Sequence, residues 1–126
     1  MKYIFTILLM LITNYGAAQS PVFVDSLEDA VALSESSKKD LLVVFSANWC
    51  KNCIALKDQL LYSNEIGFKN SIICIVDYDK RYDLVKEYKV YKIPDSRLMR
   101  NNIEISKLIG YNNKDKYKKW LNDARK

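Results

Sequence analysis

Residues 42–53 decide the fold of this chain, and they read Leu-Val-Val-Phe-Ser-Ala-Asn-Trp-Cys-Lys-Asn-Cys. The segment begins inside a continuous apolar run, residues 41–45, which is typical of a β-strand buried on both faces. A turn over residues 49–52 follows, and apolar residues then recur at helical spacing up to residue 62. The segment therefore predicts a buried strand that leads directly into a helix, with two cysteines at the junction.

The cysteine pair is predicted to lie at a helix start, where backbone N–H groups have no partner within the helix. The helix dipole and the charge of Lys51 both favour a thiolate at Cys50, so we expect its pKa to be lowered and Cys50 to be the nucleophile. Cys53 lies one turn later and is placed to attack a mixed disulfide made by Cys50. Trp49 is expected to pack beside the pair and shield it. These residues predict thiol–disulfide exchange, with the Cys50–Cys53 disulfide as the redox group and no other cofactor.

A Cys-x-x-Cys pair also has other interpretations. A zinc site needs two more ligands, and only Cys74 and no histidine remain, so we expect no metal. The lack of histidine also excludes Ser-His-Asp and Cys-His catalysis within this chain. A static structural disulfide stays open as an alternative. Cys74 lies in the apolar run 72–76 and is expected to be a buried free thiol, with a regulatory or intermolecular disulfide as the alternative.

Strand and helix patterns alternate along the rest of the chain. Ser26 is followed by an acid three residues later, which has the form of a capping box and predicts a helix from residue 27. Strands are expected at 22–24, 41–45, 72–76, 98–99 and 103–109, with a turn at Asn101-Asn102, and further helices at 53–62, 82–88 and 114–124. Buried strands that alternate with helices predict one α/β domain with a mixed sheet.

Residues 1–18 have the three parts of a cleavable signal peptide. Lys2 gives a positive start, residues 4–12 are apolar, and the small residues 16–18 precede a cleavage site before Gln19. A transmembrane anchor is the alternative, but the apolar run is shorter than the roughly 20 residues that a membrane helix needs. We therefore expect a mature domain, residues 19–126, that is exported to the periplasm or the extracellular space, where disulfide chemistry is routine.

The charge of the chain favours no polyanionic partner. The net charge is +5, and basic residues are interleaved with acidic ones. We therefore expect no nucleic-acid partner. As a separate expectation, the protein is a monomer.

Three motifs together resemble the thioredoxin superfamily. They are Phe-x-Ala-x-Trp-Cys-x-x-Cys at residues 45–53, Ile-Pro at 93–94, and Ile-Gly at 109–110. The resemblance covers the chain from about residue 22 to its end. It implies a thioredoxin fold, in which helices flank a central mixed β-sheet. It also implies that Pro94 is a cis-proline facing the disulfide and that Ile93 offers backbone groups to an extended client segment.

The resemblance implies a protein disulfide reductase or isomerase. The chain is similar to exported thioredoxin-like proteins, such as the periplasmic C-terminal domain of the transmembrane thiol:disulfide interchange protein. The implied partners are client proteins that carry disulfides or dithiols, and an upstream thiol electron donor, for which a membrane-embedded protein is a candidate. The alternative is a non-catalytic binding module in which Cys50–Cys53 is a static bridge.

The chain departs from the family pattern around the cysteines. Lys51-Asn52 replaces Gly-Pro between them, which changes residues that tune the redox potential. Val44 and Ile75 stand where thioredoxins have a buried acid and a buried lysine, so the usual proton-transfer pair is missing. Asp95 follows the proline in place of Thr. We expect Asp95 to raise the thiol pKa or to accept a proton, unless its side chain points to solvent.

Overall fold

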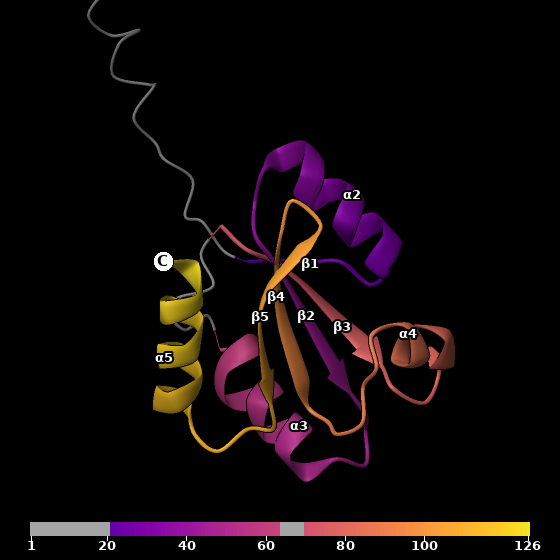
Figure 1. The fold of residues 1–126 in the computed structure, drawn as a ribbon. Helices are drawn as coiled ribbons and strands as arrows, with labels where there is room; N and C mark the ends of the chain where they lie inside the picture. Colours follow the sequence, from indigo (N-terminus) through magenta and orange to yellow (C-terminus); the bar gives the residue numbers. More distant parts are fainter. Residues whose placement is uncertain (1–20, 64–69) are drawn as a thin grey trace, which may run out of the picture.

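The computed structural model describes residues 21–63 and 70–126 (Figure 1). The expected signal peptide, residues 1–18, lies outside the described residues. The elements in chain order are β1 (Val22–Phe23), α2 (Leu27–Ser37), β2 (Leu41–Ser46), α3 (Lys51–Leu56), a π-helical turn η1 (Lys57–Leu61), β3 (Ile72–Asp77), α4 (Tyr82–Glu87), β4 (Asp95–Arg100), β5 (Ile103–Ile109) and α5 (Lys114–Arg125). Within the described ranges, no helix is both long and apolar enough to cross a membrane.

The five strands form one mixed sheet in the order β1-β3-β2-β4-β5. The first three are parallel to one another, whereas β4 runs antiparallel to β2, and β5 runs antiparallel to β4. Helices lie on opposite sides of this sheet, as α4 and α5 show in Figure 1. The predicted α/β domain with a mixed sheet flanked by helices is therefore confirmed.

Two apolar cores lie on the two faces of the sheet. One packs Val43, Phe45 and Cys74 of the sheet against α2 and α4, and the other packs Leu42 and Val44 against α3, η1 and α5. Every residue of β2 is at most 2% exposed, because neighbouring strands flank it and helices cover both of its faces. This burial explains the continuous apolar run at residues 41–45.

Two local signals act as the sequence predicts. The Ser26 side chain caps α2 by accepting a hydrogen bond from the Asp29 N–H at 3.3 Å. Asn101 and Asn102 join β4 to β5 with φ angles of 54° and 60°, a left-handed turn that matches the twist of a hairpin. The Asn101-Asn102 turn fixes where the chain reverses, and with it the pairing of β4 with β5.

Strand β4 is longer than the sequence predicts. A strand is expected at residues 98–99, but the structure begins it at Asp95, and both Asp95 and Arg97 are buried. Their side chains lie on the same face of the strand and form an ion pair with each other. The predicted start of the strand was wrong because the ion pair allows two charged residues to lie in a buried strand, where hydrophobic patterning alone predicts none.

Candidate active site

The cysteine pair lies at the junction of β2 and α3. Cys50 is the N-cap of α3, and its Sγ accepts a hydrogen bond from the Cys53 N–H at 3.2 Å. The two residues form a disulfide, with 5.2 Å between their Cα atoms. Cys50 is 8% exposed and Cys53 only 1%, so Cys50 is the sulfur that a partner reaches first. The structure thus places both predicted cysteines at a helix start and distinguishes them by accessibility.

Three loops meet at the end of the molecule that carries the pair. The connections that follow β2, precede β4 and follow β5 all lie at the lower end in Figure 1. Ile93 and Tyr78 pack against the small cluster formed by Ala47 and the two cysteines. The Ile93 carbonyl oxygen lies 3.8 Å from Cys50 Sγ, and the Ile93–Pro94 peptide bond is cis. The structure therefore brings the predicted residues Ile93 and Pro94 to the disulfide.

Gly110 ties the end of β5 to this loop. Its N–H donates to the Pro94 carbonyl oxygen at 2.7 Å, and its φ angle of +86° is one that other residues adopt only with strain. The Ile-Gly motif at 109–110 thus has a physical reason in the structure: it closes the loop against the cysteine end of the sheet.

Trp49 lies beside the pair in sequence, but its side chain is largely open to solvent. The residue is 65% exposed, and its Nε1 donates a hydrogen bond to Asp79 Oδ2 at 2.9 Å. The indole is thus held on the surface by a polar anchor from the loop after β3. Sequence reasoning missed Asp79, because nothing in the local pattern links it to a residue thirty positions earlier. Lys51 and Asn52 are also exposed, as the first two residues of α3.

The sheet behind the pair is apolar. Val44 and Ile75 are register partners in β2 and β3, and they belong to the core beneath α3. Ser46 follows on the same strand and is 2% exposed, and among the described residues its hydroxyl oxygen has no hydrogen-bond partner. The β2–β3 register therefore supplies no ionisable side chain at the Val44–Ile75 pair, as the sequence comparison with the family predicts.

Asp95 is fully buried, so the alternative that its side chain points to solvent is wrong. Its two carboxylate oxygens accept hydrogen bonds from Nε and Nη2 of Arg97, at 2.9 and 3.0 Å. Asp95 therefore does not present an unbalanced negative charge. Sequence reasoning missed Arg97, although the spacing of two residues along a strand, which puts both side chains on one face, could have signalled the pair.

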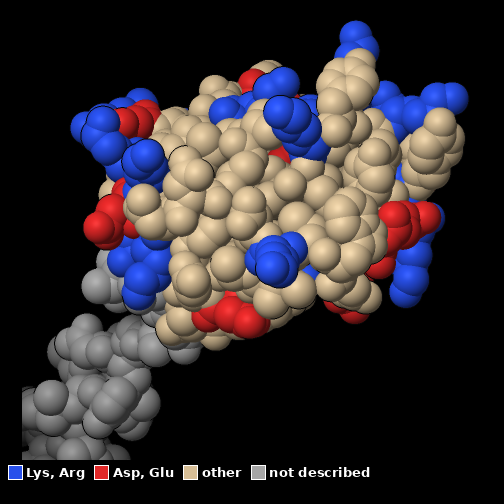
Figure 2. Space-filling view, turned by 90° about the horizontal axis from the view of Figure 1, so that it is seen from below, with Lys and Arg blue, Asp and Glu red and all other residues tan. Residues whose placement is uncertain are grey.

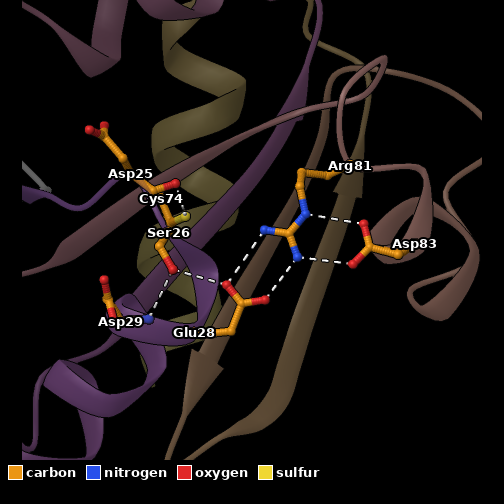
Figure 3. A network of polar contacts seen from close by, with 7 residues as sticks. All are labelled: Asp25, Ser26, Glu28, Asp29, Cys74, Arg81 and Asp83. Atoms are coloured by element: carbon orange, nitrogen blue, oxygen red, sulfur yellow. Dashed lines mark hydrogen bonds and ion pairs between the residues drawn. The ribbon is translucent and has the colours of Figure 1, made fainter.

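Cys74 is a buried free thiol, as predicted. Its Sγ donates a weak hydrogen bond to the Asp25 carbonyl oxygen at 3.8 Å (Figure 3). Burial, followed by the charges of Glu28 and Asp25, raises the pKa of this thiol to about 11. Because the thiolate is the reactive species, Cys74 is inert at neutral pH.

An exposed ion-pair network lies next to Cys74 in Figure 3. Arg81 donates to Glu28 at 2.8 Å and to Asp83 at 2.9 Å, which links α2 to the start of α4. The hydrogen bond from Arg81 is the main cause that lowers the pKa of Glu28 to about 2. In the part of the chain that the structure describes, no three His, Cys, Asp or Glu side chains form a metal site.

Comparisons with known proteins agree with this geometry. The family model described as Thioredoxin matches residues 22–123. Thioredoxin H5 of Oryza sativa subsp. japonica is 33% identical over 82 residues, which is 65% of this chain and 60% of that protein. The mitochondrial thioredoxin of Bos taurus is 28% identical over 109 residues, covering 86% and 61%. The chain thus spans about three fifths of the length of these relatives.

Solved structures share the fold. A mutant thioredoxin from Halobacterium salinarum NRC-1 superposes with a TM-score of 0.70 at 19% identity, covering 88% of this chain and 97% of that one. A thioredoxin from Trypanosoma brucei brucei superposes with a TM-score of 0.67 at 22% identity, covering 86% and 94%. These likenesses confirm the predicted fold class.

Proposed function

The chain belongs to the thioredoxin family, and on that premise we propose that it is a thiol–disulfide oxidoreductase that exchanges its Cys50–Cys53 pair with the disulfides of exported client proteins. One observation carries the proposal: the disulfide lies at a helix start, with Cys50 8% exposed and Cys53 more deeply buried at 1%. The family supports the reaction class, and the geometry supports the division of roles between the two sulfurs.

In the reduced state, Cys50 is the attacking group. The Cys53 N–H that reaches its Sγ, together with the other free N–H groups of the first helical turn, stabilises the thiolate. The thiolate attacks one sulfur of a client disulfide, a mixed disulfide forms, and the other client sulfur leaves as a thiolate that takes a proton from water. Ile93 presents backbone groups to the client segment beside this bond, and the cis peptide bond to Pro94 sets the direction of the loop.

Cys53 completes the exchange. Its thiol loses a proton and attacks Cys50 Sγ, so the mixed disulfide breaks and the second client sulfur leaves as a thiolate. The client gains two electrons, and the Cys50–Cys53 disulfide is formed again. Because Val44 and Ile75 are apolar and both oxygens of Asp95 are engaged by Arg97, water accepts this proton in our proposal.

The surface around the pair suits a protein client. Figure 2 shows that uncharged side chains dominate the middle of the lower face and that most charges lie around its rim. A hollow of about 460 Å³ adjoins the pair through Tyr78, and its other lining residues are Tyr82, Val85, Lys86, Lys89, Val90 and Tyr91. Tyr91 is 83% exposed, which makes it available to a partner. Exposed aromatic side chains near a reactive group favour docking of an extended polypeptide segment.

The proposal also includes the redox direction of the exchange and the compartment in which the protein works. The signal-like pattern of residues 1–18 supports export, to the periplasm or the extracellular space. Reduction or isomerisation of client disulfides requires an upstream thiol donor that keeps the pair reduced, and that donor is then a partner of the same surface. The protein acts as a monomer and without a metal or a further cofactor.

A reduction assay tests the proposed activity. The purified protein, supplied with dithiothreitol, should accelerate the reduction of insulin, and the Cys50→Ser variant should lose the acceleration entirely because the attacking sulfur is gone. The matched control is Cys74→Ser, which removes a buried thiol that takes no part and should keep the parent rate. A parent protein that is no faster than dithiothreitol alone would favour the static-bridge alternative.

A further inference from the structure

A buried ion pair, Asp95 with Arg97, lies directly behind the loop that faces the disulfide, and Arg97 extends it to the exposed Glu104. Asp95 is 0% and Arg97 5% exposed, and two parallel hydrogen bonds of 2.9 and 3.0 Å join them. The remaining arm of the guanidinium donates to Glu104 of β5 at 3.0 Å. Taking two charges out of water costs about as much as their attraction returns, so such a pair is weak evidence for stability alone. Its place in the fold suggests another role.

The surroundings of Arg97 hold it in one orientation. Its guanidinium lies over the ring of Phe45, 5.9 Å from the centroid, and over the ring of Tyr88, at 5.6 Å. It therefore connects β4 with β2, with the end of α4 and, through Glu104, with β5. The planar guanidinium matches a carboxylate in a two-point contact, which fixes direction as well as distance.

The carboxylate that Arg97 holds belongs to the residue after Pro94. Asp95 is the first residue of β4, where the strand leaves the Ile93–Pro94 loop, and it pairs in register with Phe45 and Ile109. The Ile93 carbonyl oxygen is 3.8 Å from Cys50 Sγ, one residue before the proline. A side chain that fixes Asp95 therefore limits how far this loop can move relative to the sulfur.

We propose that Arg97 is a positioning residue for client exchange: by clamping the Asp95 carboxylate, it holds the Ile93–Pro94 backbone at the distance from Cys50 that an extended client segment needs. The inference rests on the proposed function, since it assumes that this backbone receives the client. Arg97 touches neither the sulfurs nor the client. It acts through Asp95, so its removal affects reactions that use the loop more than those that need only the thiolate.

The chain offers a matched control in the same strand. Arg100, at the far end of β4, makes the same two-point contact with Asp40, at 2.9 and 3.0 Å. That pair is partly exposed and lies away from the cysteine loops. Arg100→Met therefore removes an arginine fork from β4 without touching the loop, whereas Arg97→Met removes the clamp.

The test compares two substrates. For a disulfide-bonded peptide client, Arg97→Met should raise KM about tenfold, whereas the rate with the small disulfide 5,5′-dithiobis(2-nitrobenzoic acid) should change less than about twofold, since that reagent needs no backbone contact. Arg97→Lys, which keeps the charge but not the fork, should give an intermediate KM. Arg100→Met should match the parent with both substrates. Equal losses with the two substrates, or no rise in KM, would overturn the proposal.

A second variant keeps the test valid if Arg97→Met does not fold. Arg97→Met leaves the Asp95 carboxylate buried without a partner, whereas the double variant Asp95→Asn/Arg97→Met removes both charges and should retain a cooperative thermal transition. It lacks the clamp, so it should show the same rise in KM. If the folded double variant binds the peptide client as the parent does, the clamp is not a positioning device.

Hydrogen exchange tests whether Arg97 holds the Ile93–Pro94 loop without using an activity assay. The Gly110 N–H is bonded to the Pro94 carbonyl oxygen, so it should exchange at least about tenfold faster in the double variant, while amides near Asn101 at the other end of the hairpin keep their rates. Unchanged Gly110 exchange would refute the clamp even if the parent enzyme is active. If the parent were inactive with both substrates, the proposed function would fall, and the Gly110 measurement would still show whether Arg97 holds the loop.

Discussion

At the scale of single residues, the chemistry depends on how three cysteines are separated. Cys50 lies at a helix start and keeps 8% of its surface exposed, Cys53 is 1% exposed one turn later, and Cys74 is buried among apolar side chains on the opposite face of the sheet. Local patterns predict these positions, because a strand, a turn and a helix start are all contiguous in sequence. They do not predict the contact of Trp49 with Asp79, because these side chains are thirty residues apart and meet only after folding.

Cys74 should make the free energy of unfolding fall as the pH becomes alkaline. Its pKa is about 11 in the folded state against the ordinary 9.0, mainly because burial disfavours the thiolate. A raised folded-state pKa contributes stability that is complete below about pH 9 and is lost as pH rises to about 11. Relative to Cys74→Val, which has no titrating group, the parent should therefore lose about 2 to 3 kcal/mol of unfolding free energy across this window.

Urea denaturation of both proteins across the window measures this difference, and the variant corrects for every other group that titrates there. A parent-to-variant difference that stays constant from pH 8 to pH 11 would show that the thiol is not protected by burial. As an independent check, iodoacetamide should modify Cys74 of the native protein at neutral pH only after urea is added.

At the scale of elements, the β4–β5 hairpin contains a turn that sequence patterns predict and a strand start that they miss. The hairpin turn was predictable, because Asn-Asn is one of the few pairs that accepts two positive φ angles. The start of β4 was not, because Asp95 and Arg97 look like a polar loop until their side chains are paired. Hydrophobic periodicity detects strands through apolar side chains, so it misses a strand that begins with a buried ion pair.

The turn itself provides a test at this scale. Asn101→Val puts a β-branched side chain at a φ of 54°, a conformation that costs such residues about 1 to 2 kcal/mol, so we expect a loss of stability of that size by urea denaturation. Lys107→Val, at an exposed position within β5, is the control and should change stability by less than about 0.5 kcal/mol. An Asn101→Val protein as stable as its parent would contradict the left-handed turn.

At the scale of the whole molecule, one sheet brings three separate loops to the same end. Because β4 is antiparallel to β2, the start of β4 lies beside the end of β2, which places the Ile93–Pro94 loop next to Cys50. The alternation of strands and helices in the sequence was enough to predict this class of fold. The identity of the proposed client was not predictable, because a recognition surface of exposed side chains, such as Tyr91, follows no fixed pattern along the chain.

The most direct test of the division of labour between Cys50 and Cys53 is to trap the intermediate. The Cys53→Ser protein, reduced and mixed with a disulfide-bonded client peptide, should accumulate a covalent adduct whose mass equals the two partners joined by one disulfide. Tandem mass spectrometry should place that bond at Cys50, and dithiothreitol should release it. A protein that forms no adduct while its Cys50 thiol is free, or whose adduct lies at Cys74, would contradict the mechanism.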